Sequence, residues 1–580
     1  MRLELSYFVA LQYFSFAVAS NLVKTSQVSY VSVTANGVES FLGIPFAESV
    51  SGEKRFTRPT PKKWSQGHTF NATQPGPACP QAKVPVQDFI FQNVTNAKED
   101  CLNLRVDRPA NVSAGAKLPV MVYIYGGGDS IGQAYDQLYS PQGIVLGSAG
   151  INKPVIYVAM NYRLNIFGFA ASAALSAEGN TNLGLRDQRL ALEWVQQNIA
   201  YFGGDPENVT IFGESDGATG VGLQCTAFGG KGGPVPFHRM ILESGAPAAD
   251  PLAASDFVAN NTAEVAKDVG CLSSDSAQTL ACLRRVPYDK LLNATLTHDS
   301  SLTAFGFDVF IGNAGDDFIP AAPSELVRSG RFCRNVPLII GWNLNDASLF
   351  TDSSLTDSTV ASYFRESFPG LTNDTLAKML SLYPASEFTT MPGSNASAGY
   401  YRASRIERDI EFVCPALQFA LAASHYSNAK AFVYQLEQTP LENFFAESNN
   451  SNYGVSHFSD IFYVFNEVQG FSAVGPTQSD IDLGTRVSGS WELFANNGVP
   501  GNSQLSKQNA SLADWPAAFT PTDVGTCELG DVSQLEVFAI GGSHEGPVMV
   551  KDSTTHQGLD KLLERCAFLT TPEFFAQIAT

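Results

Sequence analysis

A serine flanked by glycines is the residue of this chain best suited to chemistry. Residues 208–217 read Asn-Val-Thr-Ile-Phe-Gly-Glu-Ser-Asp-Gly, and Ser215 is the centre of a G-x-S-x-G pattern. The β-branched and aromatic run before it predicts a buried strand, and residues 218–224 after it are compatible with a helix. A tight turn from strand to helix needs glycine at Gly213 and Gly217 and exposes the serine hydroxyl at the carboxyl edge of a sheet. The context therefore predicts a nucleophilic serine; the alternative is a glycine-rich turn with an incidental serine.

A nucleophilic serine needs a histidine as general base and an acid that orients the histidine. Of seven histidines, only His457 lies in a turn-like stretch directly ahead of an apolar run, residues 461–465. Asp346 follows a short apolar strand predicted over 336–341, and Asp460, three residues after the histidine, is the alternative acid. An aspartate in such a loop is more often a turn or cap residue, so position alone does not assign the acid.

Three glycines follow another predicted strand. Residues 118–125 form an apolar run that ends in Gly126-Gly127-Gly128-Asp129. Glycines at this point let the backbone turn several N–H groups into one concavity, which in a hydrolase would stabilise an oxyanion. A plain turn is the alternative interpretation.

The elements that would position these residues alternate between strand and helix. Further strands are predicted at 28–33 and 38–42 (around a turn at 35–37), 155–161, 238–245 and 429–435, and an amphipathic helix at 183–202. Mostly helical stretches are predicted at 250–304 and 358–423. Such alternation implies an α/β protein with a mostly parallel sheet. We find no internal repeat, low-complexity linker or domain boundary.

Composition limits the partners and the compartment. The chain has 580 residues, 44% of them hydrophobic, and a net charge of −20, which disfavours nucleic acid and anionic membranes as partners. Residues 1–19 have a signal-peptide pattern: Arg2, an apolar stretch at 5–16 and the small residues 17–19. No other apolar run is long enough to span a bilayer. The expected protein is secreted and extracellular, with no stable membrane insertion.

Glycosylation motifs and cysteines agree with secretion. Nine N-x-S/T motifs lie in polar, turn-like contexts and are candidate glycosylation sites: Asn71, Asn93, Asn111, Asn260, Asn293, Asn373, Asn395, Asn449 and Asn509. A tenth, at Asn208, opens the strand before Ser215 and is predicted to be too enclosed. The nine cysteines show no metal-binding spacing, so we expect no metal site and no cofactor. Disulfides are the expected use, and the odd count leaves at least one thiol unpaired.

The motifs together resemble one family. Ser215, Asp346 and His457 follow the order of the α/β-hydrolases, and the chain resembles the type-B carboxylesterase/lipase family, which includes cholinesterases and secreted fungal lipases. The matching stretches are residues 41–47, 99–102, 125–128, 161–164, 182–188, 202–206, 213–217 and 243–245. The resemblance implies an α/β-hydrolase fold: a large, mostly parallel central sheet flanked by helices, with long helical insertions. Residues 20–580 would then form a single catalytic domain after the signal peptide.

The resemblance also implies roles for individual residues. Ser215 would attack the carbonyl of a small-molecule or lipid carboxylic ester and form an acyl-enzyme, with His457 as general base and Asp346 orienting it. The backbone N–H groups of Gly127, Gly128 and Asp216 would bind the oxyanion. The implied disulfides are Cys79–Cys101, Cys271–Cys282 and Cys414–Cys566, which leaves Cys225, Cys333 and Cys527 unassigned.

Three departures from the family pattern affect the expected substrate. Asp346 stands where the family usually has glutamate, Asp216 where it has alanine, and Asp129 where it has an aromatic residue. A carboxylate at Asp216 would disfavour anionic acyl groups. The loop from Cys79 to Cys101, either a flap over the site or a surface loop, lacks tryptophan and is shorter than a lipase lid, which favours an esterase.

Several alternatives remain. The apolar residues 89–91 in the Cys79–Cys101 loop keep a triacylglycerol lipase open. An enzyme dedicated to one natural product and a non-catalytic binding protein of the same fold are the others. The sequence makes no prediction of the oligomeric state.

Overall fold

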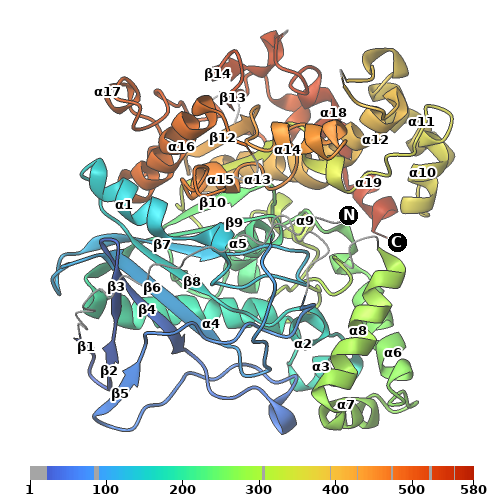
Figure 1. Cartoon of the computed structure of the whole chain (residues 1–580). Helices are drawn as coiled ribbons and strands as arrows, with labels where there is room; N and C mark the ends of the chain where they lie inside the picture. The colour runs from blue at the N-terminus through green and yellow to red at the C-terminus, as the bar shows by residue number, and fades with distance from the viewer. Residues whose placement is uncertain are drawn as a thin grey trace, which may run out of the picture.

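A large mixed sheet forms the centre of the protein. The computed structural model describes residues 22–83, 91–303, 307–391, 393–427, 429–471, 475–520, 525–553 and 555–579, so the predicted signal peptide, residues 1–19, lies outside the described residues. Within these ranges one sheet has eleven strands in the order β14-β13-β12-β11-β10-β9-β7-β8-β6-β4-β3 (Figure 1). Its strands are β3 (Val33–Ala35), β4 (Val38–Pro45), β6 (Asn103–Pro109), β7 (Leu118–Ile124), β8 (Ile156–Met160), β9 (Gly204–Glu214), β10 (Arg239–Glu243), β11 (Leu338–Asn343), β12 (Ala431–Leu436), β13 (Glu536–Ile540) and β14 (Gly546–Met549).

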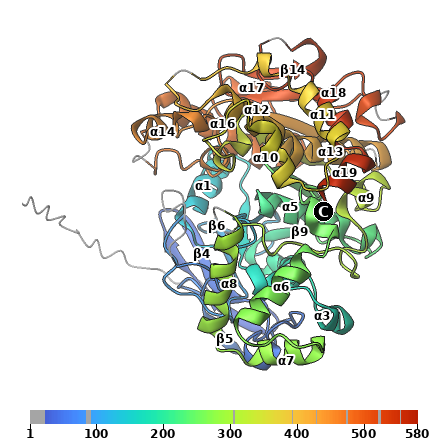
Figure 2. The same cartoon turned by 90° about the vertical axis from the view of Figure 1, so that its right-hand side faces the viewer.

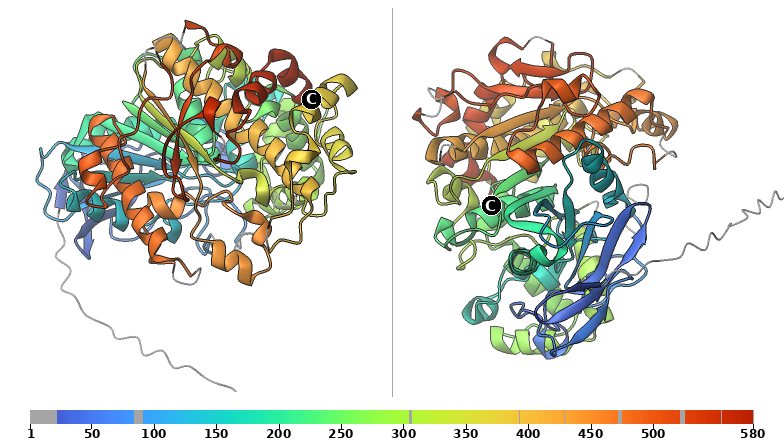
Figure 3. Two further views of the ribbon diagram at one scale, coloured as in Figure 1. Left: turned by 90° about the horizontal axis from the view of Figure 1, so that it is seen from above. Right: turned by 90° about the vertical axis from the view of Figure 1, so that its left-hand side faces the viewer.

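The middle of the sheet is parallel and buried on both faces. Strands β8, β7, β9, β10, β11, β12 and β13 pair in parallel, whereas β14 at one edge and β6, β4 and β3 at the other are antiparallel. Every residue of β8, β11 and β12 is buried. Parallel strands need helical crossovers, and these cover the two faces of the sheet, as the view from above shows (Figure 3, left).

Helices cover the sheet and form two insertions beside it. The helices are α1 (Gln142–Gly150), α2 (Asn165–Phe169), α3 (Ala173–Glu178), α4 (Leu183–Asn198), α5 (Asp216–Thr226), α6 (Phe257–Asp268), α7 (Ser276–Arg285), α8 (Tyr288–Leu302), α9 (Pro323–Arg328), α10 (Val360–Ser367), α11 (Asn373–Leu382), α12 (Ala398–Arg408), α13 (Cys414–Ser427), α14 (Glu442–Glu447), α15 (Ile461–Val464), α16 (Gln478–Asn497), α17 (Ser503–Ser506), α18 (Leu562–Leu569) and α19 (Pro572–Ile578). Helices α5 and α4 pack against β9, and α16 packs against β7 and β9. The insertions α6–α8 and α10–α12 lie on one side of the sheet, and both face the viewer in Figure 2. The fold is the predicted α/β arrangement.

The prediction of one strand over residues 28–33 is wrong. Val28–Val31 (β2) belongs to a separate sheet of three strands with β1 (Leu22–Lys24) and β5 (His68–Asn71), and only β3 forms the predicted hairpin with β4. At the break, the Ser32 hydroxyl donates to the buried carboxylate of Glu39. Local periodicity cannot show where a chain crosses between two sheets, because both segments have the same pattern.

Four disulfides join eight of the nine cysteines, all of which are in the described residues. Three are the pairs that the resemblance implies, Cys79–Cys101, Cys271–Cys282 and Cys414–Cys566. The fourth, Cys225–Cys333, links residues 108 positions apart, and Cys527 is free. Cys225 lies on α5, the helix that follows Ser215, so this bridge ties that helix to the segment ahead of β11.

The ten glycosylation motifs differ in how exposed their asparagines are. The asparagine side chains of all nine candidate motifs are exposed, whereas that of Asn208 is half-buried and close to Arg239, whose guanidinium donates to it. In the part of the chain that the structure describes, no helix is both long and apolar enough to cross a bilayer.

Candidate active site

Ser215 lies on a strained turn between β9 and α5. Its backbone has φ 59° and ψ −130°, which is unusual for a residue with a side chain. Its N–H donates to the carbonyl oxygen of Glu243 on β10 at 2.9 Å. A Cβ atom on Gly213 would lie 2.6 Å from the backbone of Gly217, and one on Gly217 would lie 2.1 Å from the carbonyl oxygen of Ile124. The two glycines are therefore required by close packing, and the turn has the geometry of a nucleophile elbow.

Two loops bring Asp346 and His457 together. Asn345, two residues after the end of β11, pairs with Ser456 in an isolated parallel bridge, and its N–H donates to the carbonyl oxygen of Val455 at 2.9 Å. The residues that follow, Asp346 and His457, are therefore held opposite each other. Nδ1 of His457 lies 2.6 Å from Oδ1 of Asp346, and Oδ2 of Asp346 accepts the backbone N–H of Asn343 at 2.8 Å.

The second ring nitrogen of His457 faces the elbow. The ring is fully buried among Phe350, Phe412 and Phe458, with centroid distances of 5.2, 5.0 and 4.6 Å. Nε2 has no hydrogen-bond partner among the described residues and lies 3.2 Å from Oε1 of Glu214, the residue before Ser215. Because Nδ1 is occupied by Asp346, Nε2 is the atom that can exchange a proton at the elbow.

Glu214 is a site residue that the sequence analysis did not identify. Its carboxyl is fully buried and, within the described ranges, neither oxygen has a hydrogen-bond partner. Burial, with repulsion from Asp460 and Asp346, raises its pKa well above the usual value. Its position directly before Ser215 could have identified it, because the turn at the elbow is so tight that the residues next to the serine lie close to the same site.

The alternative acid, Asp460, is bonded elsewhere. Its carboxyl accepts hydrogen bonds from Nδ2 of Asn343 at 3.4 Å and from the hydroxyl of Tyr434 at 3.2 Å. Burial, with repulsion from Asp346, raises its pKa to about 6. Of the two predicted acids, Asp346 is the one that hydrogen bonds to His457.

The glycine loop after β7 packs directly against the elbow. A Cβ atom on Gly126 would lie 2.8 Å from that of Ser215. The N–H of Gly128 donates to Oδ2 of Asp216 at 2.5 Å. Asp129 is buried, and this burial together with repulsion from Asp216 raises its pKa well above the usual value. The predicted oxyanion residues are thus beside Ser215, but a carboxyl accepts from one of their N–H groups.

The loop closed by Cys79–Cys101 packs against the residue that follows His457. Of its predicted apolar cluster, Phe89 and Ile90 lie outside the described residues. Phe91 is buried, and its ring contacts that of Phe458 edge-on at 5.3 Å. One end of this apolar cluster therefore packs on Phe458, the residue after His457.

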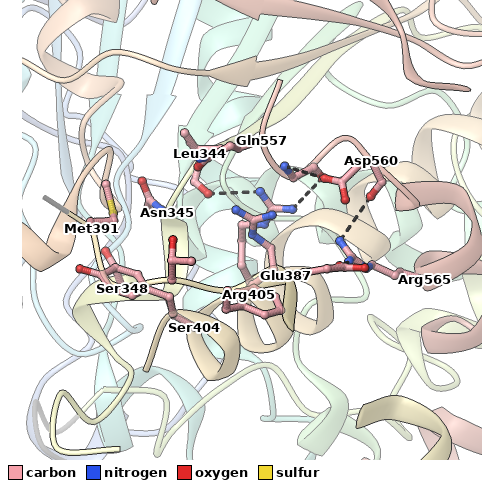
Figure 4. A pocket seen from close by; sticks show the side chains of 15 residues that line it. Leu344, Asn345, Ser348, Glu387, Met391, Ser404, Arg405, Gln557, Asp560 and Arg565 are labelled. Atoms are coloured by element: carbon pink, nitrogen blue, oxygen red, sulfur yellow. Dashed lines mark hydrogen bonds and ion pairs between the residues drawn. The ribbon is translucent and has the colours of Figure 1, made fainter. Parts of the chain in front are cut away.

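A basic pocket borders the loop that carries Asp346 (Figure 4). This cavity of about 160 Å³ is lined by Asn345 and by three arginines of which Arg408 approaches the loop. The guanidinium of Arg408 donates to the carbonyl oxygen of Leu344 at 3.1 Å and pairs with Asp409 at 2.6 Å. Arg408 thus fixes the backbone just before Asp346, and the lining includes neither Ser215 nor His457.

The raised pKa values of three carboxyl groups predict how the stability of the protein depends on pH. Burial raises the pKa of Asp250 and Glu407 to about 7 and that of Glu411 to about 8. Between the ordinary carboxyl values and these, the folded protein keeps protons that the unfolded chain releases, so the free energy of unfolding falls as pH rises. We expect the thermal unfolding midpoint to decrease between about pH 5 and pH 8. A Glu411→Gln variant should show a weaker decrease, and a midpoint that rises over this range would contradict the prediction.

Known proteins identify the family. The Carboxylesterase family model matches residues 26–536. An inactive carboxylesterase-like protein of Byssochlamys spectabilis is 36% identical over 94% of this chain and 93% of its own length. A secreted lipase of Arthroderma benhamiae is 35% identical over 96% and 95%, and Lipase 4 of Diutina rugosa is 33% identical over 83% and 92%. These similarities confirm the predicted family, its α/β-hydrolase fold and the class of enzyme, a carboxylic ester hydrolase. The chain belongs to the carboxylesterase family.

Proposed function

We propose that this protein is a secreted serine carboxylesterase that cleaves carboxylic esters through an acyl-enzyme on Ser215. The observation that carries the proposal is the position of His457, with Nδ1 bonded to Asp346 and Nε2 facing the elbow. A histidine held in this way is the general base that a serine needs, because an unassisted hydroxyl is a weak nucleophile at neutral pH.

The reaction follows from this arrangement. The Ser215 oxygen attacks the ester carbonyl carbon while its proton passes to Nε2 of His457, and Asp346 stabilises the resulting imidazolium. The N–H groups of Gly127, Gly128 and Asp216 bind the oxyanion. The intermediate then releases the alcohol, which takes the proton from His457, and water hydrolyses the acyl-enzyme by the same steps.

Polar, soluble esters are the favoured substrates. Two aspartates lie near Ser215, namely Asp129 and Asp216, and Asp216 is close enough to raise the pKa of Asp129. Carboxyl groups at the reacting centre disfavour anionic acyl groups. They also bind a long alkyl chain poorly, because an alkyl chain cannot replace the hydrogen bonds that water makes to a carboxyl group. A triacylglycerol lipase is the second candidate, supported by the relatives named lipases and by the packing of Phe91.

Residues 20–580 would form one catalytic domain, following a signal peptide at 1–19. Secretion is supported by the four disulfides, the exposed glycosylation motifs and relatives named as secreted lipases. The substrate is a small-molecule or lipid ester, with no cofactor in the proposed mechanism.

The test is hydrolysis of p-nitrophenyl esters of increasing acyl length by the purified protein. Acid-quenched samples are digested and the acyl group is located by mass spectrometry. We expect the acyl mass on the peptide with Ser215 and the fastest turnover on short acyl chains. Preference for long chains in emulsion would favour the lipase. Absence of both turnover and acylation would favour a non-catalytic protein.

A further inference from the structure

The side chain that follows the nucleophile points back at one of the oxyanion donors. Oδ2 of Asp216 accepts the N–H of Gly128 at 2.5 Å. This N–H is one of the three that the proposed function assigns to the oxyanion. A side-chain carboxyl therefore lies where the negatively charged oxygen of a tetrahedral intermediate would have to bind.

A carboxylate in this position is a strong competitor for a substrate. Hydrogen bonds from N–H groups to an ionised oxygen are roughly twice as strong as those to a neutral carbonyl. An ester carbonyl is neutral until the serine attacks, so it gains less from the N–H groups than the carboxylate that it must displace. We propose that the Asp216 carboxyl occupies the oxyanion position in the resting enzyme and must leave it before an ester is attacked. This inference rests on the proposed function.

The groups around Asp216 favour this orientation. Its titratable neighbours include the acids Asp129, Glu214, Asp250 and Asp308, together with Tyr162 and His457. The carboxyl of Asp308 lies within hydrogen-bond reach of that of Asp216, and the other three acids repel the charge of Asp216. Burial raises the pKa of Asp216, while the hydrogen bond from Gly128 and electrostatic attraction to His457 oppose the rise. The N–H of Gly128 is thus a donor that compensates the half-buried carboxyl, and leaving it is costly.

Asp216 would act on one step of the reaction. Attack by Ser215 needs an empty oxyanion position, whereas initial contact with the rest of the ester does not. Occupancy by the carboxyl should therefore slow acylation more than it weakens substrate binding. Alanine, the residue that the family usually has here, leaves the backbone N–H in place and removes the competing oxygens.

The test measures how fast Ser215 reacts with a neutral fluorophosphonate. In this reaction the serine oxygen forms a bond to phosphorus, fluoride leaves, His457 takes the serine proton, and the phosphoryl oxygen enters the oxyanion position. We expect Asp216→Ala to raise this rate constant, and kcat for p-nitrophenyl butyrate, at least about 10-fold, since one such donor is worth about 100-fold or more in turnover. Asp216→Asn keeps the shape without the charge and should be intermediate.

Asp250→Asn is the matched control. It removes a neighbouring negative charge, but its side chain makes no hydrogen bond to Gly128 in the described residues, so the rate should stay within about twofold of wild type. A comparable rise in this control would overturn the inference, because the loss of a nearby negative charge, and not the loss of the contact with Gly128, would then explain the faster reaction. Thermal unfolding of each variant checks folding, and if Asp216→Ala is unfolded, Asp216→Asn decides by the same comparison with wild type.

The remaining outcomes separate the two proposals. Labelling of the wild type with no acceleration in Asp216→Ala overturns the inference and leaves the proposed function intact. A wild type that is inert beside an Asp216→Ala variant that is labelled supports the inference and shows a blocked hydrolase. No labelling in any folded variant overturns both.

Discussion

Replacing Ser215 with alanine is expected to reduce ester hydrolysis by about a millionfold, to the limit of detection, because the attacking oxygen is lost. The fall should be in kcat, since the pocket that binds the ester is unchanged. The measurement is turnover of p-nitrophenyl butyrate together with acyl-enzyme detection by mass spectrometry.

Ser244→Ala is a closely matched control for this change. Ser244 follows β10 as Ser215 follows the adjacent β9, and both have positive φ values, 51° and 59°. The hydroxyl of Ser244 is buried, with no hydrogen-bond partner within the described ranges. Its removal should leave activity and stability nearly unchanged. Equal loss in the two variants would mean that the region tolerates no substitution, and equal activity would refute Ser215 as the nucleophile.

Replacing Asp346 with asparagine should lower kcat by about four orders of magnitude. The carboxylate accepts the Nδ1–H of His457, which leaves Nε2 free to take a proton. An amide can instead donate to Nδ1, which stabilises the tautomer with its proton on Nε2, and such a ring cannot act as the base. KM should change far less than kcat, and steady-state kinetics with the soluble ester measures both.

Two further variants decide between a role in orientation and a role in folding. Asp346→Glu restores a carboxylate of the kind that the family usually has, and it should recover part of the lost activity. Asp460→Asn alters the alternative acid, whose hydrogen bonds go to Asn343 and Tyr434, and should have a much smaller effect. A larger loss in Asp460→Asn than in Asp346→Asn would exchange the two assignments.

The contact made by Asp216 bears on why similar proteins of this family are described differently. A homologue described as inactive and others described as lipases are about equally similar to this chain. Overall identity therefore does not separate active from inactive members, and the contact between Asp216 and Gly128 is a local feature that could. The labelling experiment addresses that contact directly.

Motifs with strong local constraints could be interpreted before the structure was known. The turn at Ser215 has no room for a side chain at Gly213 or Gly217, so the spacing of these glycines around Ser215 predicted the elbow. The apolar runs at β7, β8 and β9 predicted buried strands, because only a sheet covered on both faces suits continuous hydrophobic segments. The order of Ser215, Asp346 and His457 supported the same family.

Contacts between distant segments were decided by the tertiary structure alone. Cys225 and Cys333 are 108 residues apart, and nothing local pairs them. The choice between Asp346 and Asp460 depended on the bridge between two loops more than a hundred residues apart. Strand β13 pairs with β12 next to the edge strand β14, yet it was not predicted from its short sequence.

The sequence by itself determined the family, the fold class and the identity of the candidate nucleophile, because these depend on residue types within a few positions of one another. The tertiary structure alone decided where the carboxyls point. Asp216 was identified as a departure from the family, but its hydrogen bond to Gly128 crosses 88 positions of the chain. Such a contact depends on how β7 and β9 lie side by side, and that pairing is a property of the folded sheet.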